Sequence, residues 1–159
     1  MNSFILKGNI CYSASKTELK TLYGYVVCIN GKCSGVFEEL PNKYKELEIR
    51  DVKDKLIIPG MVDLHIHAPQ YAFRGMGMDY ELLEWLNRQT FPEEAKYKDT
   101  DYARKAYQIF ADNMKNSATT RACIFATRHR QSTEILMDLM EETGLVTYVG
   151  KINMDRSAP

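Results

Sequence analysis

The sequence lacks the features that would place it in a specialised class of protein. Its 159 residues include only three histidines, four cysteines and one tryptophan, and 21 Lys and Arg balance 21 Asp and Glu. A balanced charge provides no basic surface for nucleic acid or an anionic membrane. No apolar run reaches the roughly 18 residues that a membrane-spanning helix needs. Apolar residues still make up 45% of the chain, enough to form a hydrophobic core in about one compact domain.

The N-terminus indicates a cytoplasmic protein, and the cysteines form no recognised motif. The first ten residues, "MNSFILKGNI", have no charged n-region, long apolar stretch or small-residue cleavage site of a signal peptide. The cysteine spacing fits neither a zinc ribbon nor a CxxC redox motif; the four are Cys11, Cys28, Cys33 and Cys123.

One pair of cysteines flanks a predicted hairpin turn. Asn30-Gly31 is a strong signal for a type I′ turn. In that register Ile29 faces Lys32, and Cys28 faces Cys33, which would bring the two sulfurs close enough to bond. Cytoplasmic thiols usually stay reduced, so we favour two free cysteines over a disulfide.

The first 58 residues are expected to form short strands, and the chain after Pro59-Gly60 to alternate strands with helices. The predicted early strands are residues 4–13, 22–30, 32–40, 47–52 and 55–60. The predicted later strands are residues 61–67, 119–127 and 145–154. The predicted helices are residues 80–89 with Asp79 as cap, 99–117, and 132–144 with Ser132 as N-cap and Gly144 as C-terminal stop.

This alternation predicts βαβ units with a parallel sheet. Only three such units can be counted in residues 59–159, whereas a barrel needs eight strands and about 250 residues. We therefore expect the chain to be an N-terminal piece of a longer polypeptide.

His65 and His67 are the strongest candidates for a functional site. They end the predicted strand 61–67, where side chains two residues apart share a face and lie about 6–7 Å apart along the strand. Two neutral imidazoles on one face can share a metal ion, and barrel enzymes carry their chemistry at this end of a strand. We favour this over two histidines hydrogen-bonded in a polar corner. A catalytic zinc usually takes three protein ligands, so others must come from elsewhere.

Two further polar residues near strand ends are not predicted to bind metal. His129 follows the strand 119–127 and could face a pocket, but Arg128 and Arg130 on either side favour a solvated loop residue. Lys151 could bridge metal ions, yet a lysine that extends its stem from a strand into water is the simpler interpretation.

The run "PGMVDLHIHAPQYAFRG" resembles the amidohydrolase superfamily, whose barrels open with Pro-Gly, two hydrophobic residues and Asp-x-His-x-His. Its segment "HIHAPQY" is similar to the guanine deaminase branch. The segments "NSATTRACIFATRH" and "VGKINMDRSAP" look like the second and third strand regions of the same enzymes. The resemblance covers about residues 57–159, and Ser157 departs from it where Asn would be expected.

For the fold, the resemblance implies an α/β protein built on an incomplete TIM-like (β/α)8 barrel of the amidohydrolase type. Residues 59–159 would be its first three β/α units. Residues 1–58 would be the N-terminal part of a small β-sandwich module that precedes the barrel.

For the activity, the resemblance implies zinc-dependent hydrolysis of guanine to xanthine and ammonia in purine catabolism, with one zinc per active site. His65 and His67 match the first two metal ligands. Gln70 matches the residue that hydrogen-bonds the purine, and the stretch from His67 to Gln70 would line the substrate. Gln70 suits this role because its amide both donates and accepts hydrogen bonds. The proton shuttle and the remaining ligands would lie beyond residue 159, so the chain alone is expected to be inactive.

Two alternatives stay open at this point. The protein could be another zinc amidohydrolase that acts on a related aminated ring, or a non-catalytic fragment that binds a partner. A homodimer is compatible with exposed barrel faces, and neither a nucleic acid nor a membrane is expected as partner.

Overall fold

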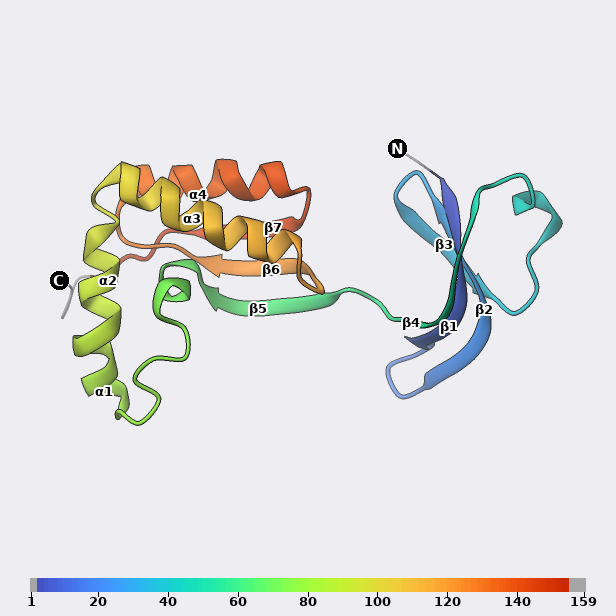
Figure 1. Ribbon diagram of the computed structural model, residues 1–159, viewed down its shortest axis with the longest axis horizontal. Coiled ribbons are helices and arrows are strands. Elements are labelled where there is room, and N and C mark those ends of the chain that lie inside the picture. The colour runs from blue at the N-terminus through green and yellow to red at the C-terminus, as the bar shows by residue number, and fades with distance from the viewer. Residues whose placement is uncertain (1–2, 155–159) are drawn as a thin grey trace. The chain divides into compact units, whose positions relative to one another are not determined.

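The computed structural model describes residues 3–154, which belong to two compact units, Met1–Pro59 and Gly60–Pro159. Each unit has its own sheet, four-stranded in the first and three-stranded in the second (Figure 1). No helix within residues 3–154 combines the length and apolar character needed to cross a membrane.

The first unit is a sheet with the strand order β3-β2-β1-β4. Its elements are β1 (Phe4–Ser13), β2 (Leu19–Ile29), β3 (Lys32–Phe37), the 3₁₀ turn η1 (Asn42–Tyr44) and β4 (Ile49–Ile57). The first three strands pair antiparallel through hairpins, and β4 returns to pair parallel with β1. Ile5, Ile10 and Val27 are its buried apolar side chains.

The predicted hairpin between β2 and β3 is confirmed. Asn30 and Gly31 have φ values of 50° and 78°, the left-handed conformations that a type I′ turn requires. Cys28 pairs with Cys33 across the two strands. Both are free, as are the other two cysteines of the chain.

The two strands predicted for residues 47–52 and 55–60 are wrong, because the structure has the single strand β4 in their place. The pairing with β1 shifts register between Lys7 and Asn9. At the same level Lys53 adopts a left-handed φ of 56°, and its amide donates to the Asp51 carboxylate over 2.8 Å. Such a bulge bends a strand without ending it, whereas the polar residues around it suggested a turn.

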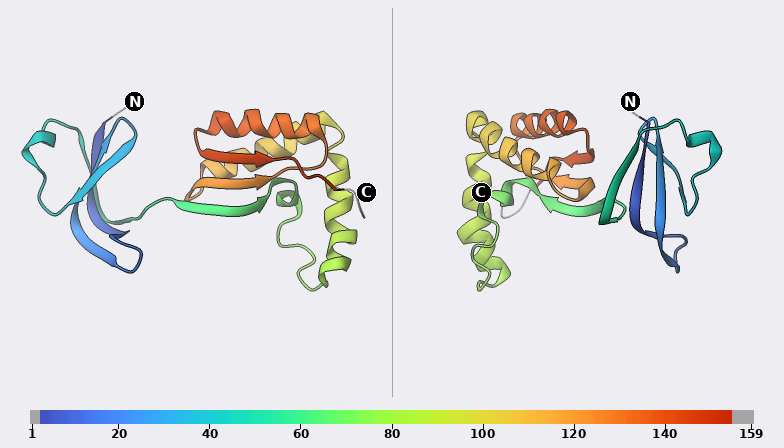
Figure 2. Two further views of the ribbon diagram at one scale, coloured as in Figure 1. Left: turned by 180° about the vertical axis from the view of Figure 1, so that it is seen from behind. Right: turned by 45° about the vertical axis from the view of Figure 1, so that its right-hand side comes forward.

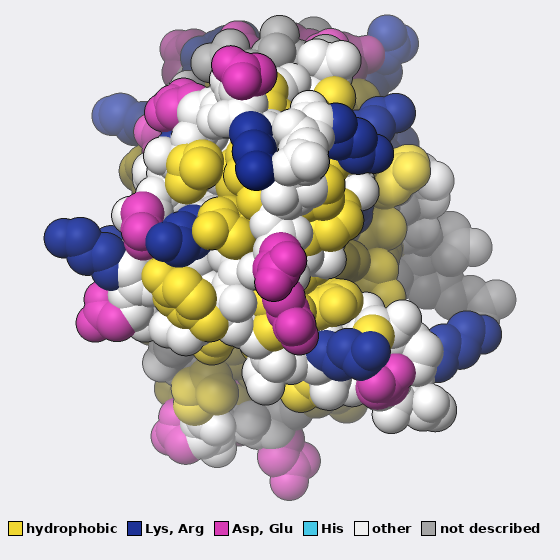
Figure 3. Space-filling view, turned by 90° about the vertical axis from the view of Figure 1, so that its right-hand side faces the viewer, with side chains coloured by type: hydrophobic (Ala, Val, Ile, Leu, Met, Phe, Trp, Pro, Cys, Tyr) yellow, Lys and Arg dark blue, Asp and Glu magenta, His cyan; other side chains and the backbone are white. Residues whose placement is uncertain are grey.

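One face of the molecule mixes hydrophobic side chains with charges of both signs (Figure 3). This agrees with the balanced composition, 21 basic and 21 acidic residues. The large apolar side chains that the first unit exposes are Leu19, Tyr23, Ile49, Leu56 and Ile58.

The second unit is a parallel sheet with the order β5-β6-β7, and two long helices cover one of its faces (Figures 1 and 2). The parallel sheet and the alternation of strands with helices are therefore confirmed. The strands are β5 (Met61–His67), β6 (Thr119–Phe125) and β7 (Val146–Gly150), and the two long helices are α3 (Thr100–Lys115) and α4 (Arg130–Thr143).

The core of this unit lies between the sheet and the two long helices. Ala122 and Ile124 of β6 point toward the helices, where Phe110 of α3 and Leu136 of α4 are fully buried. The helical spacing of apolar residues in α3 predicted this stripe, because positions three and four apart share a face. The opposite face of the sheet carries no helix within the described residues.

The start of α4 differs from its prediction. The helix begins at Arg130 with His129 as its N-cap residue, so Ser132 lies inside the first turn. Ser132 is fully buried, and its hydroxyl donates to the His129 carbonyl over 3.0 Å. The predicted cap is therefore wrong. The stop at Gly144 is confirmed, because this residue has a left-handed φ of 75°.

The helix predicted for residues 80–89 is longer than expected. Helical turns run without a break through α1 (Leu82–Trp85), the π-helical turn η3 (Leu86–Thr90) and α2 (Phe91–Lys96). Pro92 does not end this segment: it lies in the first turn of α2, directly after the π-helical turn, in which the Phe91 amide donates to the Leu86 carbonyl. The predicted cap Asp79 is also wrong, since Glu81 precedes the first turn and makes no capping bond.

We expect Asp99→Ala to lower the stability of the protein by about 1 kcal/mol, the usual value of an N-cap. Asp99 caps α3, and its carboxylate accepts the amides of Asp101 and Tyr102 over 2.9 and 3.2 Å. The measurement is the thermal midpoint of the second unit's unfolding. Asp79→Ala is the matched control and should leave it unchanged. Equal losses in both variants would contradict the assignment of the cap.

Candidate active site

Strand β5 brings its two histidines to the sheet face that lies opposite the helices. The ring centres of His65 and His67 are 5.1 Å apart. Both rings contact Phe125 at the end of β6, with centroid distances of 4.7 and 4.9 Å, and the His67 ring stacks on it. Ile66 between them packs against the core on the helix side, which follows from the alternation of side chains along a strand.

The pairing of β5 with β6 is irregular just before the histidines. The register shifts between Asp63 and Ile66. Within this interval the backbone amide of His65 donates to the Asp63 carboxylate over 3.0 Å. A side chain thus replaces a backbone acceptor beside the candidate metal ligands.

The two imidazoles fit a zinc ion. Nitrogen ligands that bind zinc tetrahedrally at about 2.0–2.1 Å place their ring centres about 5 Å apart. The Nδ1 atom of His67 is buried without a hydrogen-bond partner, and burial together with the neighbouring His65 lowers the pKa of His67. A lower pKa favours the neutral imidazole, which is the form that binds metal. Within residues 3–154 no group of three or more His, Cys, Asp or Glu side chains is placed to hold a metal ion.

A cleft of about 560 Å³ opens beside the histidines. Gln70 lines it together with His65 and His67, because the short turn η2 (Ala68–Phe73) carries the chain directly from the strand across the cleft. The structure therefore brings together all three residues that the sequence singled out.

The far wall of the cleft is apolar and was not predicted. Phe73, Met76 and Trp85 line it. The rings of Phe73 and Trp85 lie 5.6 Å apart, and the Trp85 indole donates to the Met76 carbonyl over 3.3 Å. The loop between residues 74 and 81 has no periodic pattern, so only its content of methionine and aromatic residues could have indicated a planar, apolar ligand.

The turn that carries Gln70 is held from α2. The hydroxyl of Tyr97, the residue that ends α2, donates to the Pro69 carbonyl over 3.3 Å in a buried environment. Burial raises the pKa of Glu94 on the same helix, while a hydrogen bond with the Gln70 side chain acts in the opposite direction. Backbone and side chain of the turn thus each contact this helix end.

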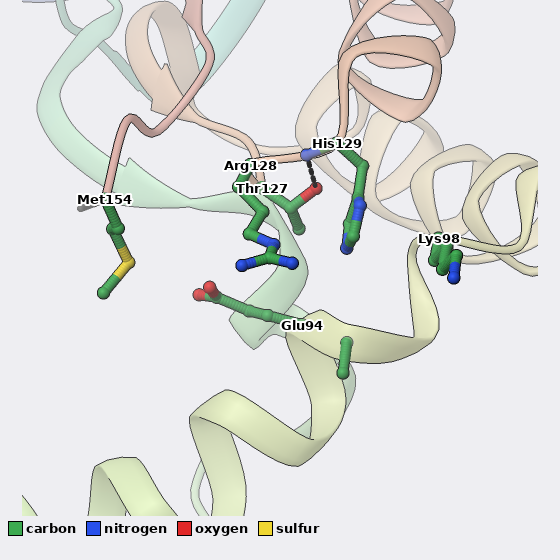
Figure 4. A pocket seen from close by; sticks show the side chains of 7 residues that line it. Glu94, Lys98, Thr127, Arg128, His129 and Met154 are labelled. Atoms are coloured by element: carbon green, nitrogen blue, oxygen red, sulfur yellow. Dashed lines mark hydrogen bonds between the residues drawn. The ribbon is translucent and has the colours of Figure 1, made fainter. Parts of the chain in front are cut away.

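A second pocket, of about 120 Å³, lies between α2 and the segment after β6 (Figure 4). Glu94 and Lys98 border it from α2 and the turn that follows, and Thr127, Arg128 and His129 from the segment after β6. The His129 amide donates to the Thr127 hydroxyl over 3.3 Å, which fixes this segment at the start of α4.

The predicted solvated position of His129 needs correction. The side chain is half-buried and lines this second pocket, apart from the cleft of His65 and His67. Burial, followed by the charges of Arg128 and Lys98, lowers the pKa of His129. The sequence suggested solvation because of the flanking arginines, but the helix start turns the ring inward.

Lys151 is exposed, as predicted, but it follows β7 instead of lying within it. Its ammonium group donates to the Ile152 carbonyl and to the Asn153 side chain. The motif "MDRSAP" begins at Met154, and its remaining residues, 155–159, lie outside the described residues.

Comparisons with known proteins agree with this geometry. The model of the amidohydrolase family matches residues 56–158. Guanine deaminase of Dictyostelium discoideum is 31% identical over 175 residues, which cover 98% of this chain and 38% of that protein. Guanine deaminase of Mus musculus is 34% identical over 163 residues, which cover 96% of this chain and 36% of that protein.

Solved structures give the same result. The crystal structure of guanine deaminase from C. acetobutylicum, with bound guanine in its active site, superimposes with a TM-score of 0.92 and 45% sequence identity. The match covers 99% of this chain and 38% of that one. The chain thus spans less than two fifths of the length of these relatives.

Proposed function

The chain belongs to the amidohydrolase family, and we propose that it forms the first part of an enzyme that hydrolyses guanine to xanthine and ammonia. The observation that carries the proposal is that His65, His67 and Gln70 line one cleft. The two imidazoles are close enough to bind one metal ion, and the amide of Gln70 can form hydrogen bonds with a purine. The guanine deaminases that the chain resembles over nearly its whole length support the choice of substrate.

The proposed cofactor is one zinc ion, held in part by His65 and His67. When bound, zinc lowers the pKa of a coordinated water from 15.7 toward about 7 and so supplies a nucleophile for hydrolysis near neutral pH. Phe125 stacks on His67 and fixes the plane of that ring. The Nδ1 atom of His67 is one of three buried side-chain polar atoms for which the described residues supply no hydrogen-bond partner, and the only one of the three on an imidazole.

Gln70 is proposed to orient the substrate. It lies three residues beyond His67, and Pro69 between them restricts both its own φ and the conformation of Ala68. A restrained segment of this kind would keep a substrate contact at a fixed distance from the metal, where a small displacement lowers the reaction rate. The apolar wall with Phe73 and Trp85 would then exclude water from one side of the base.

For the architecture we propose that the three parallel strands are the opening of a (β/α)8 barrel and that the first sheet is the N-terminal part of a small β-sandwich. The support is twofold. The histidines lie at the carboxyl ends of the strands, where barrels place their sites, and the relatives are more than twice as long as this chain. The missing zinc ligands and the proton shuttle would come from the remainder of the barrel.

We also propose that the protein acts in the cytoplasm, in the breakdown of purines. All four cysteines are free, including Cys28 and Cys33, which face each other across a hairpin. Free thiols in such a position are typical of a reducing compartment.

The complete gene product should convert guanine to xanthine. We expect ammonia and xanthine to appear in equal amounts, the activity to disappear on dialysis against a chelator, and zinc to restore it. The fall in guanine absorbance measures the rate, and the mass of the gene product shows whether the barrel is completed. Adenine serves as a control substrate. Turnover that survives complete removal of metal would contradict the proposal.

A further inference from the structure

Tyr97 is buried, and its hydroxyl forms a hydrogen bond with a distant part of the chain. The residue ends α2 and is 1% exposed. Its single hydrogen bond reaches 28 positions back along the chain to the Pro69 carbonyl, over 3.3 Å. Pro69 and Gln70 share the peptide bond whose carbonyl accepts this hydrogen bond. The hydroxyl therefore holds the peptide unit that leads into Gln70.

The ring of Tyr97 is held firmly. It packs on Tyr107 with a centroid distance of 4.7 Å and meets Tyr102 edge to face at 5.4 Å. Tyr102 in turn donates to the buried carboxylate of Glu93, which also pairs with Lys96 over 2.7 Å. Burial raises the pKa of Tyr102 to about 12 and that of Tyr97 further still, so both remain hydrogen-bond donors. A donor locked in this way can fix the atom that accepts from it.

Pro69 has one backbone group that can form a hydrogen bond, its carbonyl. Proline has no amide hydrogen, so the carbonyl that it contributes is the only hydrogen-bonding group of this residue. A buried carbonyl without a partner costs about 1–3 kcal/mol, and Tyr97 removes that cost in one geometry of the turn only.

We propose that Tyr97 is a positioning residue that sets where Gln70 meets the substrate. The inference rests on the proposed function. Tyr97 fixes the peptide that precedes Gln70, and Glu94, one turn earlier on the same helix, contacts the Gln70 side chain. The bond with Gln70 counteracts the effect of burial on the pKa of Glu94, as expected where a carboxylate oxygen accepts and the amide nitrogen donates. This arrangement leaves the amide oxygen of Gln70 to accept from an N–H group of the base.

The test is a double-mutant cycle in the complete gene product, with Tyr97→Phe and Gln70→Ala alone and together. We expect Tyr97→Phe to lower kcat/KM for guanine about tenfold, because a misplaced contact loses its directional bond. In the Gln70→Ala background the same change should alter kcat/KM less than twofold, since there is no side chain left to position. Zinc content should stay constant in all four proteins.

Tyr107→Phe is the matched control. It removes a hydroxyl from the neighbouring ring of the same buried cluster, and that hydroxyl lies by Thr127 and makes no bond to the turn that carries Gln70. We expect kcat/KM to change less than twofold in either background. This separates the loss of one bond from a general loosening of the cluster.

The outcomes distinguish the positioning role of Tyr97 from the proposed function. If Tyr97→Phe lowers kcat/KM by the same factor with and without Gln70, or does not lower it at all in an active enzyme, the positioning role is refuted while the proposed function stands. If the unsubstituted protein does not convert guanine, the proposed function falls and the inference falls with it.

Discussion

Replacing either His65 or His67 with alanine should abolish guanine turnover by the complete protein, with a fall in kcat/KM of at least about a thousandfold. The two rings lie 5.1 Å apart on one sheet face, so each would supply one ligand of a shared zinc. Loss of one imidazole leaves the ion short of the protein ligands that a catalytic site normally holds. Zinc per protein chain, measured by elemental analysis, should fall in both variants.

His129→Ala is the control for this pair. It removes the only other histidine of the chain, and its ring lines a separate pocket at the start of α4. We expect zinc content to stay at the level of the unsubstituted protein. If His65→Ala or His67→Ala keeps full zinc, that residue supports a ligand without being one and leaves the ligand list.

Gln70→Ala should cost roughly 2–4 kcal/mol of transition-state binding, about a 30- to 1000-fold loss of kcat/KM, while zinc content stays unchanged. The loss arises because truncation leaves polar groups of the bound purine without a partner in the cleft. The separation of activity from metal content distinguishes Gln70 from the two histidines. Both quantities are measured on the same preparation of the complete protein.

Gln108→Ala provides the matched substitution. Gln108 lies on α3, where its amide donates to Asp112 over 2.9 Å on an exposed surface. We expect no change in kcat/KM. A Gln70→Ala variant with full zinc and near-native kcat/KM would show that Gln70 only satisfies the local backbone of its loop, the common role of loop amides.

The features that could be predicted from the sequence depend on neighbours along the chain. The strand that ends at His67, the hairpin at Asn30 and Gly31, and the stop at Gly144 each follow from patterns a few residues long. The same holds for the approach of Gln70 to the histidines, because a three-residue step allows few alternatives.

The features that were missed depend on contacts with distant segments. The single strand β4 survives its bulge because β1 continues to pair beyond it, and no local signal reports that partner. A proline such as Pro92 usually ends a helix, but here the helical turns continue from the π-helical turn before it into α2. The bond from Tyr97 to Pro69 joins residues 28 positions apart, so neither residue could be recognised as part of the site from its own surroundings.

The register of β5 decides which of its side chains face the cleft. A slip of β5 by one residue would turn Leu64 and Ile66 toward the cleft and both imidazoles into the helix layer. A regular ladder of backbone hydrogen bonds can form in either register and therefore does not distinguish the two registers. The packing of Ile66 against the core on the helix side does distinguish them, since a slip would move this side chain into the cleft. Where the register shifts, the Asp63 carboxylate accepts the His65 amide, and Ile66 and His67 then pair with Ile124 and Phe125.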